Sequence, residues 1–341
     1  MPSIQLIAGF AALLAPANVN PEAEVSRDLI EAHIRALPEL RAVYVEPERQ
    51  QGLADAERIV AERLRAMGYE PRLEQLDWTT GGKVPVRRDG EWVVVDDPEP
   101  RRWHNVIVEI PGREAPEEVI IVGAHFDAVP MSPGADDNAS GVAGAMEVAR
   151  ILRERPMRRT VRIVFFNLEE IGLIGARQHA AAMKARIEAG EESLVGMISL
   201  EMIGYFCDEP GCQTSPIPPI PGVFEPPDTG EDIVLVATIP SRPFAHALHD
   251  GMIEAEPTMP IVLVDFLPGV GAMAPDTRRS DHAPFWDIGE QAVMITDSSE
   301  FRNPHYHKPS DTIETLDLER MTLVVRQVVG GVWRVAGPIE E

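Results

Sequence analysis

Cysteine is scarce in this chain: only Cys207 and Cys212 are present, in the segment FCDEPGCQ. Two cysteines cannot form a structural zinc site by themselves, because such a site takes four ligands. With Pro and Gly between them, they can either close one small surface disulfide or stay as free thiols. A disulfide would suit an exported protein.

Basic residues are also in the minority, with 31 Lys and Arg against 55 Asp and Glu and a formal net charge of -24. This charge makes nucleic acids and anionic membrane surfaces unfavourable partners, and it favours cations such as metal ions or a peptide ammonium group. Beyond the N-terminal segment the sequence has no apolar run long enough to span a bilayer. Stable membrane insertion is therefore not expected.

Residues 1–24 form an apolar N-terminal segment that includes Ala15-Pro16-Ala17, which resembles a signal-peptide cleavage site. No Lys or Arg precedes Arg27, although signal peptides usually begin with basic residues. The segment is therefore expected to be either a signal peptide or a stretch that packs on the body of the protein. Export to the periplasm or medium is slightly favoured over a cytoplasmic location, and both stay open.

Strand and helix patterns alternate along the rest of the chain, which predicts one α/β domain over residues 25–341 with βαβ units and a largely parallel central sheet. Residues 208–230 are rich in Pro and are expected to be a long surface loop. Strands are expected over residues 72–78, 91–97, 105–112, 117–125, 159–167, 193–203, 232–240, 260–267 and 291–297. Helices are expected over residues 27–69, 140–155, 172–190 and 244–255, and from residue 316 onward.

Polar side chains stand at the ends of three successive predicted strands. His125 and Asp127 end one strand, Glu169 and Glu170 follow the next, and Glu201 ends the third. Parallel strands end at one edge of a sheet, where open α/β folds bind their ligands. So many acidic groups at one edge are costly unless a positive charge lies among them. Carboxylates mixed with imidazole suit zinc or a similar divalent ion.

Five segments resemble the motif blocks of the M28 zinc aminopeptidase family, in the family's order: GAHFDAVP, GADDNASG, NLEEIGLIGA, SLEMIGY and NPHYHKPSDT. The resemblance covers about residues 104 to 317. It implies a three-layer α/β/α sandwich with a mixed, largely parallel central sheet, as in zinc exopeptidases. It also implies metal ligands for two zinc ions, although another divalent metal stays open: His125, Asp137, Glu170, Glu201 and His307.

The resemblance also assigns the other roles. Asp137 would bridge the two ions and precede a cis peptide bond, while Asp136 would be a neighbour without direct ligation. Glu169 would be the general base, and Asp127 would hold the imidazole of His125. Glu201 departs from the commonest family pattern, which has Asp, but glutamate offers the same oxygens one methylene further out.

The expected activity is hydrolysis of N-terminal peptide bonds in a peptide or aminoacyl substrate. A hydroxide bridging the two ions would attack the carbonyl, with Glu169 moving the proton. Tyr306 either donates a hydrogen bond to the oxyanion or only packs. Substrate specificity and oligomeric state stay open, and the loops 205–232 and 266–280 are expected to build the pocket.

Three other functions stay open beside this one. Related enzymes cyclise N-terminal glutamine with one zinc, and other relatives are co-catalytic zinc carboxypeptidases or amide deacylases. A binding module that has lost its metals is the third. Outside the ligand set, Asp281 and His282 are expected in a pocket wall or a structural role, His305 at a surface turn, and Arg302 in an ion pair with Asp297 or Glu300.

Overall fold

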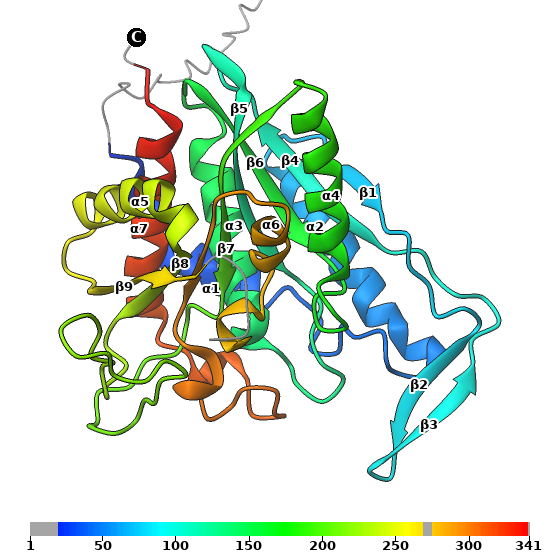
Figure 1. Cartoon of the computed structure of the whole chain (residues 1–341). Coiled ribbons are helices and arrows are strands. Elements are labelled where there is room, and N and C mark those ends of the chain that lie inside the picture. Colours follow the sequence, from blue (N-terminus) through cyan, green and yellow to red (C-terminus); the bar gives the residue numbers. More distant parts are fainter. Residues whose placement is uncertain (1–19, 269–274, 340–341) are drawn as a thin grey trace, which may run out of the picture.

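A computed structural model of the chain describes residues 20–268 and 275–339 (Figure 1). Most of the predicted signal segment, residues 1–19, lies outside these described ranges. Within them, no helix is both long and apolar enough to cross a membrane. Cys207 and Cys212 are joined in a disulfide at the start of the Pro-rich loop, which decides between the two expected states of the cysteines.

Eight strands of the described chain form one mixed sheet. In spatial order the strands are β1 (Arg72–Gln75), β4 (His104–Ile110), β6 (Arg159–Phe166), β5 (Ala115–His125), β7 (Ser193–Glu201), β10 (Ala292–Thr296), β8 (Ile233–Thr238) and β9 (Ile261–Leu267). The three strands that carry the polar residues, β6, β5 and β7, are parallel neighbours in the centre of the sheet, and β10 continues this parallel set. The pairs β1–β4, β4–β6 and β10–β8 are antiparallel, and the edge pair β8–β9 is parallel.

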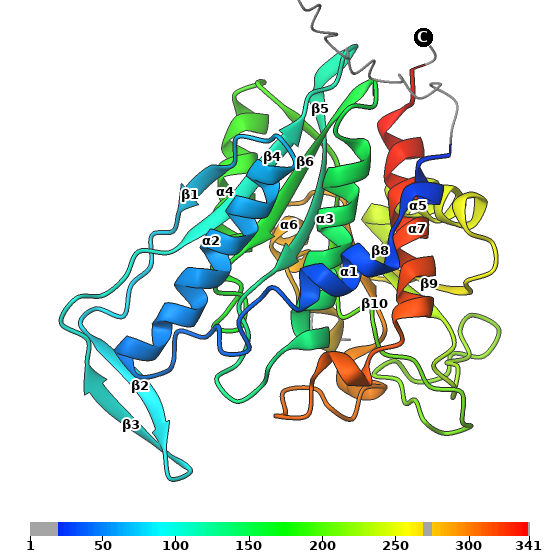
Figure 2. The same cartoon turned by 180° about the vertical axis from the view of Figure 1, so that it is seen from behind.

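Helices cover both faces of the sheet (Figures 1 and 2). On one face the apolar side chains of α4 (Ile174–Glu188) and α6 (Ala283–Asp287) pack on the strands. The other face buries a larger apolar cluster under five helices. These are α1 (Arg27–Ile34), α2 (Gln51–Ala66), α3 (Gly141–Leu152), α5 (Arg242–Ala255) and α7 (Leu318–Ala336). The predicted three-layer α/β/α sandwich with a mixed central sheet is confirmed.

The long helix expected over residues 27–69 is wrong, because α1 and α2 are separate. Pro38 and Pro47 lie between them, and proline lacks the N–H that a helix interior needs. The connecting segment carries Arg41, which is buried near the candidate site.

The strand expected over residues 91–97 is real, but it does not join the main sheet. β3 (Glu91–Asp96) pairs with β2 (Lys83–Arg88), which the sequence pattern missed. The turn between them is Asp89-Gly90, and both residues have positive φ. An Asp-Gly pair between two β-branched runs is a strong hairpin signal, so the sequence did contain the information. This hairpin projects from the body of the domain, at the lower right of Figure 1.

Candidate metal centre

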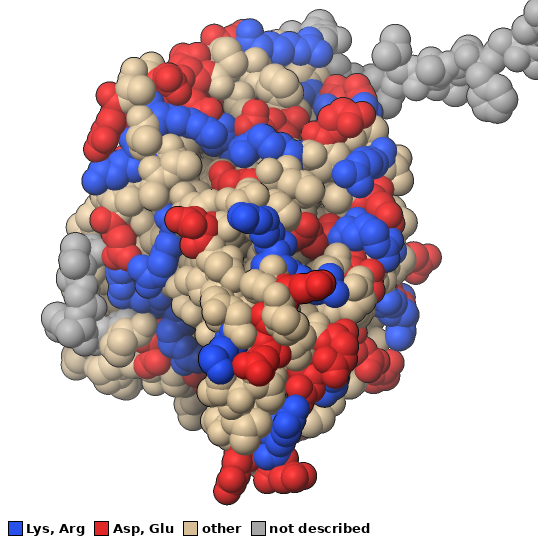
Figure 3. Space-filling view, turned by 90° about the vertical axis from the view of Figure 1, so that its right-hand side faces the viewer, with Lys and Arg blue, Asp and Glu red and all other residues tan. Residues whose placement is uncertain are grey.

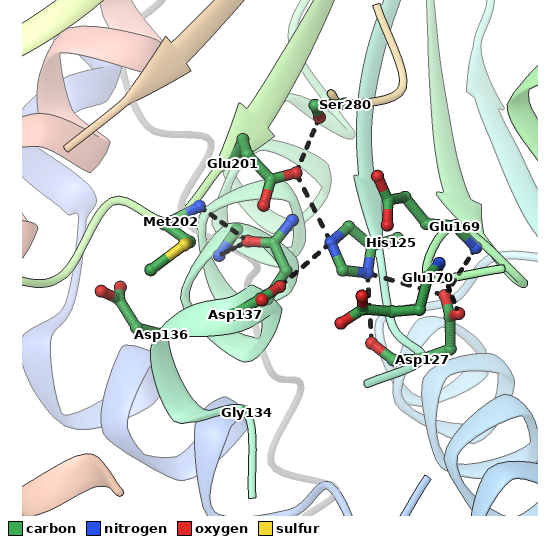
Figure 4. A network of polar contacts seen from close by, with 12 residues as sticks. His125, Asp127, Gly134, Asp136, Asp137, Glu169, Glu170, Glu201, Met202 and Ser280 are labelled. Carbon is green, nitrogen blue, oxygen red and sulfur yellow. Dashed lines mark hydrogen bonds and ion pairs between the residues drawn. The ribbon is translucent and has the colours of Figure 1, made fainter. Parts of the chain in front are cut away.

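His125 lies at the carboxyl end of β5 and is fully buried. The preceding residues 119–124 are buried as well, because β5 is a central strand covered on both faces. The Nε2 atom of His125 is 3.4 Å from Oδ1 of Asp137 and 3.4 Å from Oε2 of Glu201 (Figure 4). Glu201 ends the parallel neighbour β7 and accepts a hydrogen bond from Ser280 Oγ at 2.7 Å.

A second group of donor atoms forms around His307. Its Nε2 atom is 3.1 Å from Oδ2 of Asp137 and 3.3 Å from Oε2 of Glu170. The two oxygens of Asp137 therefore lie opposite two different imidazoles. Five sequence-predicted ligands from five separate segments are thus brought together around one carboxylate.

These donors fall into two groups that could each hold a cation. One is His125, Glu169 and Glu201, and the other is Asp137, Glu170 and His307, with ligand atoms within 4.8 Å of one another in each group. Zinc binds its ligands at about 2.0–2.1 Å in a tetrahedron, which places neighbouring donor atoms about 3.4 Å apart. The spacings of 3.1–3.4 Å between nitrogen and oxygen match this value. His125 Nε2 and Glu170 Oε1 are also buried without a hydrogen-bond partner, as expected of atoms meant for a metal.

The turn that carries Asp137 depends on a glycine and a cis peptide bond. Gly134 has φ 63°, and a Cβ there would lie 2.2 Å from the carbonyl oxygen of Asp137. The peptide bond between Asp137 and Asn138 is cis, as the family resemblance implied. The side chain of Asp136 points away from the imidazole of His125 (Figure 4). Asp136 accepts the N–H of Gly204 at 3.0 Å and of Asn303 Nδ2 at 2.7 Å, so it ties neighbouring loops together.

Asp127 positions both the imidazole and the glutamates. Its main-chain oxygen is 3.1 Å from Nδ1 of His125. Its carboxylate accepts the backbone N–H groups of Glu169 and Glu170, each at 3.1 Å. The expected hold on His125 is thus made chiefly by the carbonyl, and the carboxylate fixes the loop after β6.

The acidic groups raise one another's proton affinity. Burial raises the pKa of Glu169 well above its usual value, and the charges of Glu170 and Glu201 add to this. Burial and the charge of Asp137 raise the pKa of Glu170 to about 7. Burial opposes the charge on His307, but its contacts with Asp137 and Glu170 prevail and raise its pKa to about 10. In the metal-free protein, Glu169, Glu170 and His307 therefore hold protons more tightly than usual, where bound cations would otherwise balance the negative charge.

Two buried residues that support the centre had not been singled out in the sequence. Asp311 accepts the N–H of Asp136 at 2.9 Å and of Asp137 at 3.2 Å. Arg41 donates to the carbonyl oxygens of Phe126 at 2.7 Å and Gly134 at 2.5 Å. Asp311 stands four residues after His307 and belongs to the same motif, whereas no sequence signal marked Arg41.

The remaining candidates have various partners. The ring of Tyr306 stacks on His307 with centroids 3.8 Å apart, and its hydroxyl accepts from Arg279 Nη2 at 2.8 Å. Asp281 is buried beside the centre but belongs to neither donor group.

The expected partners of Arg302 are wrong: it donates to Asp232 at 2.8 Å, because the loop after the disulfide brings that carboxylate alongside it. His305 is bonded to Ser310 in an exposed turn, as expected.

A small apolar cavity of about 90 Å³ adjoins the centre at Glu201 and Tyr306. Its lining draws on both loops that were expected to build the pocket, within the described residues. The apolar part of the wall includes Ile217, Phe224, Val236, Val262, Val264 and Met294.

Comparison with known sequences shows which family the chain belongs to. The profile of Peptidase family M28 matches residues 105–216. The uncharacterized protein YfbL of Escherichia coli (strain K12) is 31% identical over 242 residues, which are 67% of this chain and 69% of YfbL. The chain belongs to peptidase family M28.

Solved structures agree on the M28 fold. BSAP, a zinc aminopeptidase from Bacillus subtilis, superposes with a TM-score of 0.65 at 16% identity, over 93% of this chain and 96% of BSAP. The glutaminyl cyclase of Fimbriiglobus ruber superposes with a TM-score of 0.57 at 15% identity, over 94% and 96% of the two chains. At these identities the likeness concerns the fold alone.

Proposed function

We propose that this M28 chain is an aminopeptidase that works with two zinc ions. His125 and Glu201 would hold one ion, Glu170 and His307 the other, and Asp137 would bridge them. The observation that carries this proposal is the approach of the two Asp137 oxygens to two different imidazoles, at 3.4 and 3.1 Å. A site for a single ion would not need a carboxylate between two histidines.

Glu169 is the proposed general base. Bound zinc would supply Lewis acidity, which lowers the pKa of a water molecule towards about 7 and polarises a carbonyl group. Glu169 would accept the proton of that water and return it to the leaving amine. Tyr306 accepts a hydrogen bond from Arg279, so its own hydroxyl proton can be donated to the carbonyl oxygen as negative charge develops there.

The proposed position of the substrate's N-terminal residue is the cavity beside Glu201 and Tyr306. The neighbouring carboxylates favour a free ammonium group, which supports an exopeptidase acting from the N-terminus. The apolar wall favours an N-terminal residue with an aliphatic side chain, since burial of such a group stabilises the complex by about 25 cal/mol per Å².

Cyclisation of N-terminal glutamine is the second candidate, since a glutaminyl cyclase shares the fold. It ranks lower because a reaction that needs no activated water gives no role to two donor groups whose histidines both face Asp137. Carboxypeptidase activity has less support again, because no Lys or Arg except Arg279 lines the cavity in the described chain, and Arg279 is already paired with Glu300.

Export remains a proposal, and the disulfide between Cys207 and Cys212 supports it because such bonds persist in oxidising compartments. The test is the N-terminal mass of the protein recovered from the cell fractions of its source. Loss of the apolar segment in an extracytoplasmic fraction would support export, and an intact cytoplasmic form would contradict it.

The activity is tested with zinc-loaded protein on aminoacyl amides and peptides that begin with Leu, Ala, Lys or Glu, beside a peptide that begins with Gln. We expect release of the N-terminal residue and no cyclisation. Glu169→Gln should keep its zinc and lose turnover by about 10²-fold or more. Glu188→Gln, an exposed glutamate on α4, is the matched control. Cyclisation without hydrolysis, or near-normal turnover of Glu169→Gln, would overturn the proposal.

A further inference from the structure

A second cavity, of about 220 Å³, lies on the other side of the centre. Its inner end is formed by Asp127, Glu170 and His307, so it reaches the donor group that the first cavity does not contact. The two cavities have no lining residue in common. The metal centre therefore lies between two separate cavities, each of which contacts a different donor group.

The outer wall of the second cavity is apolar. Trp92, from the projecting β2–β3 hairpin, lies there with Tyr44, Val129 and Met131. Trp92 is 55% exposed and Met131 is 41% exposed, so the cavity opens to the surface at this end. Exposed apolar residues that gather at one cavity in this way are typical of a ligand-binding surface.

The charges around this cavity are informative as well. Among the described residues that line it, none is Lys or Arg. Away from the donor group, the wall therefore offers a ligand apolar contacts, against which the side chains of a continuing peptide chain could pack. On the side of the molecule that Figure 3 shows, acidic and basic side chains are interspersed (Figure 3).

The hairpin stands apart from the main sheet but is held in place. Its two strands pair with each other, and Arg88 of β2 donates two hydrogen bonds to Glu46 at 2.7 and 3.0 Å. Glu46 belongs to the connecting segment that also carries Tyr44 of the cavity wall. The position of Trp92 is thus coupled to the wall opposite it.

We infer that this cavity binds the part of a peptide substrate that follows the scissile bond, and that Trp92 contacts the side chain of the second residue. The inference depends on the proposed aminopeptidase function. An enzyme that removes one residue needs a small cavity for that residue and an open path for the rest of the chain. The cavity beside Glu201 meets the first need, and the cavity under the hairpin meets the second. A second residue that is aromatic or aliphatic is then favoured.

The test compares substrates that share N-terminal leucine. One series of peptides has Phe, Leu, Ala, Asp or Lys in second place, and leucine amide has no second residue. The wild type is expected to prefer Phe and Leu. Trp92→Ala should lower kcat/KM for Leu-Phe and Leu-Leu peptides about tenfold, mainly through KM, and stay within about twofold of wild type on leucine amide.

Val94→Ala is the matched control, because Val94 is 66% exposed on the same strand and does not line the cavity. Thermal unfolding of both variants should match the wild type, since both side chains are largely exposed. The inference is overturned if Trp92→Ala lowers kcat/KM equally on leucine amide, or if Val94→Ala has the same effect. Hydrolysis of leucine amide without any preference at the second residue would overturn this inference alone. Absence of hydrolysis of every substrate would overturn the proposed function and the inference with it.

Discussion

The carboxylate of Asp311 accepts the backbone N–H of Asp137, with 3.2 Å between Oδ2 and N. Its other oxygen accepts the N–H of Asp136 at 2.9 Å. A residue that takes no part in either donor group thus fixes the backbone of the one carboxylate that both groups approach. The position of Asp137 in the centre therefore depends on the buried carboxylate of Asp311 as well as on the ligands themselves.

Asp311→Ala should therefore weaken metal binding without removing any ligand. Partners that orient metal ligands are worth about 10–100-fold in affinity or activity, and we expect a loss of that size. Zinc retained after dialysis against a mild chelator, together with kcat/KM on leucine amide, measures it. Glu314→Gln, an exposed change in the same segment, should behave as wild type. Full zinc retention and activity in Asp311→Ala would show that the turn holds itself.

Arg41→Met should destabilise the whole domain. Its guanidinium is buried and donates to the carbonyl oxygens of Phe126, Pro38 and Pro133, which would lose this donor. It also donates to the carbonyl oxygen of Gly134, which would keep the N–H of Ala139. Unsatisfied buried carbonyls cost about 1–3 kcal/mol each, so a loss of about 3 kcal/mol or more in the free energy of unfolding is expected. Urea unfolding measures it, with the exposed Arg58→Met as the control. A loss under about 1 kcal/mol would contradict this account.

Three groups at or beside the centre have a raised pKa in the metal-free protein and contribute to the pH dependence of its stability. The pKa of Glu170 is raised from its usual 4.5 to about 7 by burial and by Asp137. That of Asp311 is raised from 3.8 to about 7 by burial and by the charge of Asp136. That of His307 is raised from 6.5 to about 10, because its acidic partners outweigh burial.

All three shifts have the same sign. A group whose pKa is higher in the folded state stabilises the fold below its unfolded pKa, and this contribution is lost as pH rises through the folded pKa. The metal-free protein should thus lose this stabilisation between about pH 4 and pH 10. Zinc needs deprotonated ligands, so the rise in Tm on adding zinc should be larger at about pH 8 than at about pH 5.5. An equal or smaller rise at the higher pH would contradict the assignment.

Val262→Phe should narrow the small cavity beside Glu201, because Val262 is part of its apolar wall. Removal of N-terminal Leu should slow by roughly tenfold, as one poorly fitting side chain costs about 1–3 kcal/mol. Removal of N-terminal Ala, which needs less room, serves as the internal control and should change little. An equal effect on both substrates would place the N-terminal side chain elsewhere.

Much of this molecule can be predicted from its sequence, because the signals are local. The apolar runs that end in His125, Phe166 and Glu201 predict central strands, and parallel strands bring their ends to one edge. The pair Asp136 and Asp137 could be separated into two roles only through the family resemblance, since the composition of the turn is the same for both.

What escaped the sequence depends on contacts between distant segments. Arg41 lies in a stretch with helical periodicity, and only the tertiary structure brings its side chain to the turn before Asp137. Arg302 has two acidic residues close in sequence, yet it pairs with Asp232 from another loop. The β2–β3 hairpin escaped prediction for a different reason. Pro85 lies within its first strand and obscures the strand pattern there, although the Asp89-Gly90 turn is a hairpin signal strong enough to outweigh it.

The zinc content of the purified chain tests the central claim most directly. The wild-type protein, loaded with zinc and freed of excess metal, should retain two ions per chain by elemental analysis, and Asp137→Ala should lose both, because Asp137 is the proposed ligand of each ion. Glu188→Gln should retain both as the control. One ion or none in the wild type, or two ions retained in Asp137→Ala, would contradict a centre built around a shared Asp137.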